Sequence, residues 1–465
     1  MRYLQKFTAV FLAMVVATNV LSAPPTYQIP KHVIKEATEL RERALRDDTA
    51  WHLLSGLTTE VGPRLAGSPK DTEAVQWAVN CLKKLAFDKV WLEEVRFPKW
   101  TRGKETARLM APFQQPLHVT ALGFSGSTGE QGITAEVVHF RTLADLQAVP
   151  DGALKGKIAF ISHRMERHRD GHGYGPAVAA RSQGPAVALK KGAVALLIRS
   201  IGTDSNRLPH TGMTRWKPGQ PTIPAAALSN PDADLLVRVF KYERPVRLHL
   251  TLTPKIDQVA VSHNVIAQIN GTERPDKIII IGGHLDSWDL GTGAVDDGAG
   301  VAITTAAAHL IGSSGKRPKR SVRVVLFANE EMGLWGARSY AERNRGSLKN
   351  HVIGGESDFG AGPIYALRTR VNPKARGFFA QVMPVLRPLG IELGDNEGSG
   401  GPDMYPLRSQ GMPVFDLEQD GTDYFDWHHT ANDTLDKIDP RNIRQNTAAY
   451  AALVWILANT EVSFR

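Results

Sequence analysis

The chain has 465 residues but only one cysteine, Cys81, so no intrachain disulfide can form. Without disulfides the fold must be held by its hydrophobic core, and a chain of this length buries enough surface to allow that. Cys81 lies in the helical-looking stretch AVQWAVNCLKKLAF, which indicates a small buried side chain rather than a reactive thiol. The composition therefore predicts a globular protein stabilised by packing.

The sequence also has little that could span a membrane. A spanning helix needs about 20 consecutive apolar residues, and the apolar stretch 7–17 near the N-terminus is shorter. It follows two basic residues, Arg2 and Lys6, and precedes a small-residue cleavage site, Leu21-Ser22-Ala23. This order predicts a signal peptide over residues 1–23. We expect a secreted or periplasmic protein with no stable membrane span once the signal is removed.

Dense charge of one sign is nearly absent. The formal net charge is +9, but the excess is spread along the chain. The one dense cluster, KRPKR at 316–320, lies between a helical stretch and a strand, where a solvated connection is expected. Nucleic-acid binding is not expected for an exported protein of this kind.

The pattern of hydrophobic and turn-forming residues changes twice along the mature chain. Residues 24–111 include helical periodicity at 31–60 and 71–86. Residues 112–258 contain short β-like runs separated by Gly and Pro, which predicts a β-rich insert. Residues 259–465 alternate strands with helices. This pattern predicts an α/β fold with a mainly parallel sheet and helices on both faces, interrupted by the insert.

Polar side chains follow four of the predicted strands, 276–283, 321–329, 351–357 and 412–418. Ligands of parallel sheets bind beyond the carboxyl ends of the strands, so we expect these side chains to converge. They are His284, Asp286, Asp289, Asp296, Asp297, Glu330, Glu331, Asp358, Asp426, His428, His429 and Asp433.

Carboxylates gathered at one edge repel each other unless cations lie between them. His with Asp and Glu, and no Cys, favours Zn²⁺, with Mn²⁺ or Co²⁺ as possible substitutes. The donors suffice for two ions. A second histidine group, His163, His168 and His172, occupies an Arg-rich loop and is interpreted as solvated.

The strings GGHLDSWD, AVDDGAG, NEEMGLWGA, ESDFG and HHTANDT resemble the motifs of the co-catalytic di-zinc exopeptidases, in matching order and spacing. GPRLAGSP near the N-terminus resembles the entry to that fold, and 112–258 resembles a protease-associated insert. The likeness covers essentially the whole mature chain. It implies a catalytic domain formed by 24–111 and 259–465, and a possible homodimer.

Carried over by motif, the resemblance assigns roles to individual residues. One Zn²⁺ would be held by His284 and Asp358, and the other by Glu331 and His429, with Asp296 bridging both. Glu330 matches the general base that takes a proton from a metal-activated water. The remaining assignments are Asp286, which would orient His284, and Asp403, Tyr424 and Trp288, which could contact substrate. His428, beside His429, stays an alternative near-site residue.

We therefore expect an exported di-zinc metallopeptidase that hydrolyses dipeptides. A dipeptidase must recognise a free amine and a free carboxylate, whereas an aminopeptidase acting on longer peptides recognises only the amine. The same fold could also serve as a non-catalytic binding module, or as a cyclotransferase that uses one zinc. The complete donor set and Glu330 argue against both of these functions.

Overall fold

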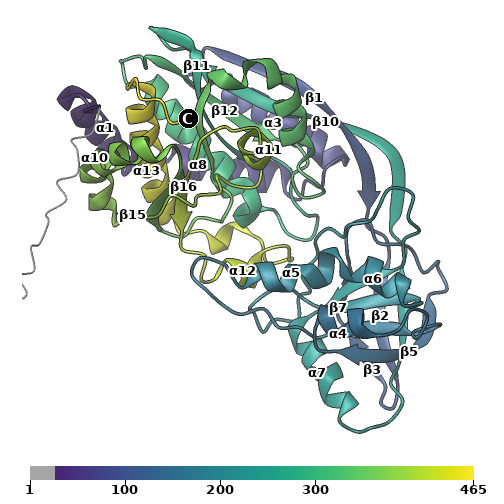
Figure 1. Ribbon diagram of the computed structural model, residues 1–465. Helices are drawn as coiled ribbons and strands as arrows, with labels where there is room; N and C mark the ends of the chain where they lie inside the picture. Colours follow the sequence, from purple (N-terminus) through teal and green to yellow (C-terminus); the bar gives the residue numbers. More distant parts are fainter. Residues whose placement is uncertain (1–26) are drawn as a thin grey trace, which may run out of the picture.

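The structure is a computed structural model that describes residues 27–465, so the predicted signal peptide lies outside the described residues. Two sheets, one in each half of the molecule, form its framework (Figure 1). Among the described residues, no helix has the length and apolar character needed to cross a membrane.

The first sheet carries the polar strand ends. Its strands, in spatial order, are β1 (Lys89–Thr101), β10 (Lys255–Ile269), β12 (Arg320–Phe327), β11 (Arg274–His284), β13 (His351–Glu356), β16 (Val414–Gln419), β14 (Ile364–Arg370) and β15 (Glu392–Leu393). The predicted strands 276–283, 321–329, 351–357 and 412–418 correspond to β11, β12, β13 and β16, within a few residues at each end.

The prediction of a mainly parallel sheet is wrong, because the sheet is mixed. Its centre, β12-β11-β13-β16, is parallel, but β1, β10 and β14 each pair antiparallel with a neighbour. The reversal at β14 follows from chain length. Only the short segment 357–363 joins β13 to β14, whereas a parallel crossover needs a dozen or more residues.

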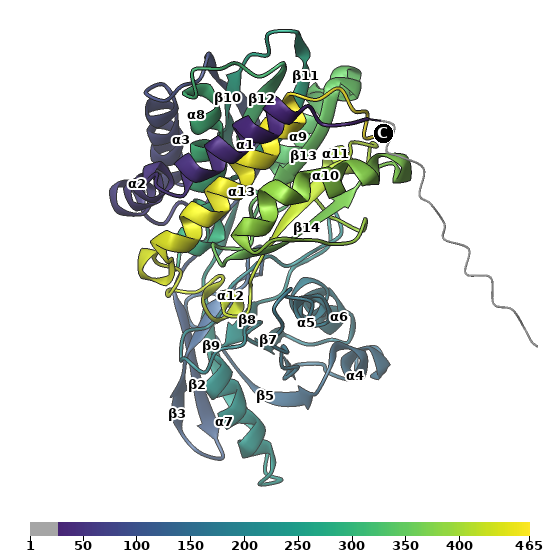
Figure 2. The same ribbon diagram turned by 90° about the vertical axis from the view of Figure 1, so that its left-hand side faces the viewer.

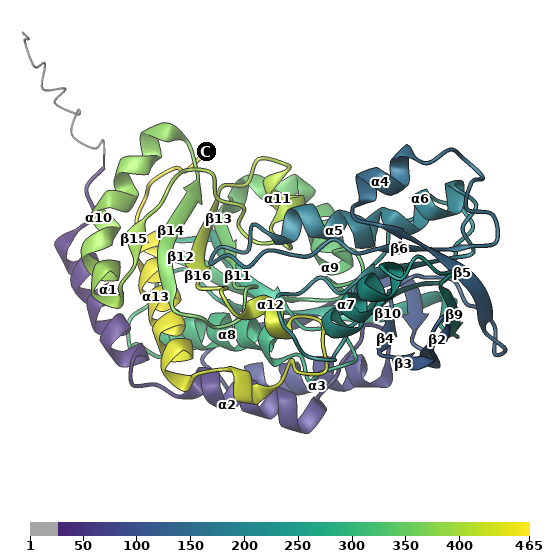
Figure 3. The ribbon, with the colours of Figure 1, turned by 90° about the horizontal axis from the view of Figure 1, so that it is seen from below.

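Alternating side chains of the buried strand β11 face two different helical layers. Ile279 and Ile281 pack in the cluster that contains residues of α1 (Lys31–Ala44), α2 (Thr49–Gly56), α8 (Ala299–Gly312), α10 (Arg376–Leu386) and α13 (Pro440–Ala458). Ile278 and Ile280 pack in the cluster that contains residues of α9 (Trp335–Arg343) and α11 (Tyr405–Arg408). α1, α8 and α13 lie together on one side of the sheet (Figure 2, Figure 3). Helices therefore cover both faces, as predicted.

The predicted helix over 31–60 is divided into α1 and α2. The turn at 45–48 separates them, and the Asp47 carboxylate accepts the N–H of Thr49 at the start of α2. An Asp side chain that pairs with nearby backbone in this way competes with helix continuation. α3 (Pro69–Leu82) corresponds to the second predicted helix, 71–86, and begins with Ser68 as its N-cap.

The second sheet occupies the segment between β1 and β10. Its strands, in spatial order, are β3 (Gln115–Leu117), β2 (Glu105–Ala111), β9 (Arg247–Leu252), β5 (Ile133–Phe140), β6 (Ile158–Ile161), β7 (Ala195–Arg199), β8 (Ala225–Leu228) and β4 (Val119–Ala121). It is accompanied by α4 (Leu143–Ala148), α5 (Tyr174–Ser182), α6 (Gly184–Lys190) and α7 (Asn230–Phe240). The domain boundaries at 111/112 and 258/259 stay a prediction.

The two sheets are tied together at Arg102. β1 and β10 form a long antiparallel ribbon that leads from the first sheet to the second (Figure 1). Just beyond β1, Arg102 forms a bidentate ion pair with Asp289, which follows β11, and another ion pair with Glu105 in β2. The nitrogen–oxygen distances of 2.7–2.9 Å fit charge-assisted hydrogen bonds. The second sheet is thus attached directly to the loop that follows His284.

A second arginine, Arg64, holds the same loop. It is fully buried and donates to the carbonyl oxygens of Leu285, Thr292 and Gly293. These carbonyls lie in the segment between β11 and Asp296. A buried carbonyl without a donor is costly, so Arg64 fixes the path of this segment.

We expect Arg64→Met to lower the free energy of unfolding by about 3 kcal/mol, because it leaves several buried carbonyls unpaired. Arg46→Met is the matched control, since Arg46 is exposed and its guanidinium contacts only its own helix end. That change should stay within about 0.5 kcal/mol of the unmodified protein. Denaturant unfolding measures both, and equal effects would contradict this role of Arg64.

Candidate metal centre

The parallel centre of the first sheet brings the predicted donors to one edge. His284 is the last residue of β11, and Asp358 follows β13 by two residues. Glu330 and Glu331 follow β12 after Asn329, whose positive φ of 53° turns the chain. His429 lies beyond β16, just after α12 (Tyr424–Trp427). The structure thus joins residues that are up to 145 positions apart, from His284 to His429.

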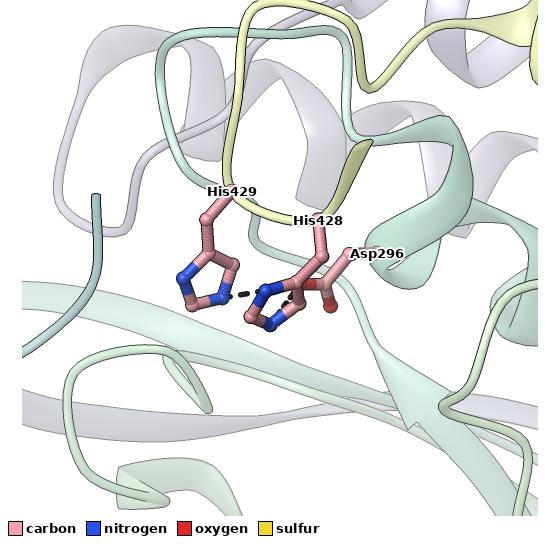
Figure 4. Close-up of side chains that lie close together, drawn as sticks. All are labelled: Asp296, His428 and His429. Atoms are coloured by element: carbon pink, nitrogen blue, oxygen red, sulfur yellow. Dashed lines mark ion pairs between the residues drawn. The ribbon is translucent and has the colours of Figure 1, made fainter. Parts of the chain in front are cut away.

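Asp296 lies between the two histidines predicted as ligands. Its Oδ1 is 3.0 Å from Nε2 of His284, and its Oδ2 is 3.2 Å from Nε2 of His429. Figure 4 shows Asp296 facing His429 and the adjacent His428. One carboxylate with a different imidazole at each oxygen is the geometry that a bridging ligand requires.

Each histidine also meets a second carboxylate. Nε2 of His284 is 3.6 Å from Oδ1 of Asp358, and Nε2 of His429 is 3.0 Å from Oε2 of Glu331. The two groups, His284 with Asp358 and His429 with Glu331, share only Asp296. The structure therefore brings together all five predicted ligands, in the division expected from the motifs.

Asp286 and Asp297 hold the backbone around His284. His284 Nδ1 is 3.0 Å from the backbone oxygen of Asp286, while the Asp286 carboxylate is 3.7 Å away and accepts the N–H of Glu330 at 3.0 Å. Asp297 accepts the N–H of His284 and that of Gly300 in α8. Asp286 thus contacts His284 mainly through its main chain and also fixes the backbone of Glu330.

The His429 loop is held from the insert. Nδ1 of His429 lies 3.2 Å from the backbone oxygen of Thr211, and the Thr211 N–H donates to the backbone oxygen of His429. His210, buried next to Thr211, places Nδ1 2.7 Å from the oxygen of His428. A hydrogen bond at Nδ1 fixes ring orientation and leaves Nε2 for a metal.

The charges at this edge are poorly compensated by protein groups. Burial acts to lower the pKa of His284, but its contacts with three carboxylates hold that pKa well above the ordinary value. Burial raises the pKa values of Glu331 and Asp358. Burial, with the neighbouring charge of Glu331, also raises the pKa of Glu330 well above its usual range. Burial is thus the main cause of the carboxylate shifts, and the neighbouring carboxylates are the cause of the shift of His284.

The donor set fits divalent cations. Glu331 Oε1 and Asp358 Oδ1 are buried and have no hydrogen-bond partner among residues 27–465. Possible ligand atoms form two groups, and within each group they lie within 4.8 Å of one another. One group is His284, Asp296 and Asp358, and the other is Asp296, His428 and His429. Imidazole nitrogens and carboxylate oxygens together suit Zn²⁺.

His428 remains an alternative donor. Its Nε2 is 3.5 Å from Asp296 Oδ2, and its ring stacks on that of His429 with centroids 3.5 Å apart. Burial and the neighbouring His429 lower the pKa of His428 well below its usual value. The distance to Glu331 favours His429 as the ligand of the second group.

The three predicted substrate contacts have different settings. Trp288 is buried, with its ring edge-to-face against Trp100 and 5.7 Å from the ring of His429. Tyr424 lines a cavity of about 310 Å³ and packs against Phe359. Asp403 is fully buried, and its N–H donates to Glu356. None of these three side chains contributes a ligand atom to the two groups around Asp296.

The sequence places Asp433 among the converging side chains but does not indicate its role. Asp433 is buried and accepts the N–H groups of Val295 and Asp296 at 2.6 and 3.2 Å. Burial, with the charge of Asp296, raises the pKa of Asp433 to about 7. The only signal in the sequence is its place in the same HHTANDT string as His429.

Comparisons with known proteins agree with this geometry. Residues 264–454 match the model of Peptidase family M28. Carboxypeptidase Q of Homo sapiens is 34% identical over 92% of this chain and 89% of its own length. A peptidase M28 precursor from Shewanella amazonensis has a TM-score of 0.92 and 50% identity, covering 93% of this chain and 98% of that one. A zinc aminopeptidase from Bacillus subtilis shares the fold, with 20% identity and a TM-score of 0.62. The match covers 87% of this chain and 94% of that one.

The fold and site define a metallopeptidase of the α/β class. The chain belongs to peptidase family M28, which confirms the family resemblance and the prediction of a peptidase.

We expect Asp296→Asn to remove most of the bound metal, because an amide offers one weak oxygen where two charged oxygens face the imidazoles. Metal per chain after zinc loading, measured by mass spectrometry, tests this. Asp436→Asn is the matched control, since the Asp436 side chain is exposed and pairs with Lys437. If both variants hold as much zinc as the unmodified protein, Asp296 is not a metal ligand.

Proposed function

We propose that the protein is an exported di-zinc exopeptidase that hydrolyses dipeptides. The observation that carries the proposal is the position of Asp296, with one oxygen facing His284 and the other facing His429. A carboxylate placed in this way can bridge two ions. His284 and Asp358 would hold one zinc, and Glu331 and His429 the other. The zinc aminopeptidase that shares the fold supports the choice of metal.

Glu330 is the proposed general base. Zinc held by the proposed ligands would supply an acidified water and a polarised substrate carbonyl. The Glu330 carboxylate would accept the proton of that water during attack and return it to the departing amine. The N–H of Glu330 is held by Asp286, so the chain that bears the base is fixed relative to His284.

Taken together, the relatives support dipeptides as the substrates of this protein. A carboxypeptidase requires a free C-terminal carboxylate, and an aminopeptidase requires a free N-terminal amine. Carboxypeptidase Q is similar to the chain along most of its length, and an aminopeptidase shares the fold. A dipeptide carries both free termini. The second candidate is an aminopeptidase acting on longer peptides, and a non-catalytic module is disfavoured because the proposed ligands and Glu330 lie together.

Export and assembly are part of the same proposal. The charged, apolar and small-residue order of residues 1–23 supports a signal peptide and a secreted or periplasmic location. The possible homodimer rests on the family resemblance.

We expect Glu330→Gln to lower kcat by at least about 100-fold, the range over which general acid–base catalysis contributes. Bound zinc and thermal stability should be unchanged, because Glu330 is not a proposed ligand. Glu331→Gln is the matched comparison at the next residue, and it should lose zinc as well as activity. Full turnover by Glu330→Gln would show that another group is the base.

The substrate prediction is tested with three peptides of one sequence series: a free dipeptide, its C-terminal amide and the corresponding tetrapeptide. We expect chelator-sensitive cleavage of the free dipeptide alone, measured as release of the N-terminal amino acid. Equal cleavage of all three would favour the aminopeptidase. Failure of the zinc-loaded protein to cleave any of them would contradict an exopeptidase function.

A further inference from the structure

A cavity beside the metal centre has no role in the mechanism described above. It has a volume of about 220 Å³ and lies next to Asp358, between β14, β16 and the 397–402 loop. Its wall includes Asp170, from the Arg-rich loop of the insert. Because it adjoins one of the proposed zinc ligands, a peptide bound for cleavage at the metals could place a side chain in it.

The wall of this cavity is strongly acidic. Besides Asp358 it contains five carboxylates, and the single basic side chain in it is Arg368. Those five are Asp170, Glu356, Glu397, Asp416 and Glu418. An arrangement of this kind raises the local concentration of cations.

Arg368 offsets this charge only in part, because its guanidinium is already paired with two carboxylates. It forms two hydrogen bonds with Asp395, at 2.8 and 3.0 Å, and one with Glu418 at 2.7 Å. Ion pairs with both carboxylates raise the pKa of Arg368 above its ordinary value. A substrate carboxylate would compete with both partners for Arg368, so the cavity does not favour anions.

Glu356 supplies the observation that points to a bound group. It is 5% exposed and lines the cavity. Its Oε2 accepts the N–H of Asp403 at 2.7 Å, but its Oε1 has no hydrogen-bond partner among residues 27–465. A buried carboxyl oxygen without a donor costs free energy, and a donor from a ligand would remove that cost.

We propose that this cavity binds the cationic side chain of a lysine or arginine residue of the substrate, with Glu356 Oε1 as a hydrogen-bond acceptor. The proposal rests on the proposed exopeptidase function and names its preferred substrates. The insert takes part through Asp170. The adjacent Arg169 pairs with Asp420 at 2.9 Å and lies 3.7 Å over the ring of Tyr365, which holds this loop against the first sheet.

The test compares binding of lysinamide and norleucinamide to the zinc-loaded protein by isothermal titration calorimetry. Both molecules carry the same α-amine and amide, and only lysinamide has a side-chain ammonium. We expect lysinamide to bind at least about tenfold more tightly, as a charge-assisted hydrogen bond allows. Equal affinities would overturn the proposal.

Variants assign the preference to the cavity. Glu356→Gln keeps an acceptor for the Asp403 N–H but removes the carboxylate that a bound cation would hold in its charged form, and should reduce the preference to about threefold or less. Asp170→Asn, in an exposed loop, should weaken the preference without disturbing the core, and decides the matter if Glu356→Gln does not fold. Glu392→Gln is the matched control, because Glu392 is exposed in β15 and lies outside the cavity wall. A full preference in Asp170→Asn and Glu356→Gln would overturn the proposal.

Two further arms separate the possible failures. Nα-acetyl-lysinamide lacks the α-ammonium. If it fails to bind while lysinamide and norleucinamide bind equally well, the acidic wall recognises the α-amine instead. Hydrolysis of Lys-Ala and norleucyl-alanine is measured in parallel, with an expected kcat/KM ratio of about ten. If norleucyl-alanine is cleaved equally well, only the charge preference is wrong. If neither is cleaved while lysinamide still binds preferentially, the exopeptidase function fails and the cation site stands.

Discussion

The structure depends on holding one buried carboxylate, that of Asp296, between two imidazoles. A carboxylate and two imidazoles remain at 3.0–3.2 Å only if the chains that carry them are fixed independently. Hydrogen bonds from the backbone of Val295 and Asp296 to Asp433 fix the central chain. Arg64 fixes the segment before it through three carbonyls. These contacts support the site without touching a metal, and such supporting contacts commonly determine ligand orientation.

The second sheet, together with Arg102 just before β2, also belongs to this support. It reaches the metal edge at two places: Arg102, itself paired with Glu105, holds Asp289 after β11, and Thr211 holds His429 through the ring and the backbone. The loops bearing His284 and His429 are therefore connected through the second sheet as well as the first. A segment that interrupts the sequence of one domain is thus part of the geometry of its site, and a change in its packing would move both ligand loops.

The sequence predicts that these side chains converge because each lies in a segment that ends or follows a strand with a strong hydrophobic pattern. His284 and Asp358 could be placed at the sheet edge from local sequence alone, and the motifs then divided the ligands into two groups. The strand directions at β1, β10 and β14 could not be predicted, because pairing partners are set by connection lengths and long-range packing. Asp433 and Arg64 were missed for a related reason: their partners lie 137 to 229 residues away, and a buried Asp or Arg has no local pattern.

The electrostatics of the edge connect the metal centre with the cavity beside it. Burial raises the pKa of Glu356 to about 8, with the neighbouring charge of Asp358 adding to the effect, so the carboxylates of the two regions influence one another. Cations bound at Asp296 and Asp358 would relieve the repulsion at the centre, whereas Glu397 and Asp170 line the cavity and belong to neither ligand group. Arg368 offsets only part of the charge on the cavity wall, because it pairs with Glu418 there and with Asp395 outside it. A site that needed only to bind metals would gain nothing from this surplus, whereas one that also binds a cationic side chain would.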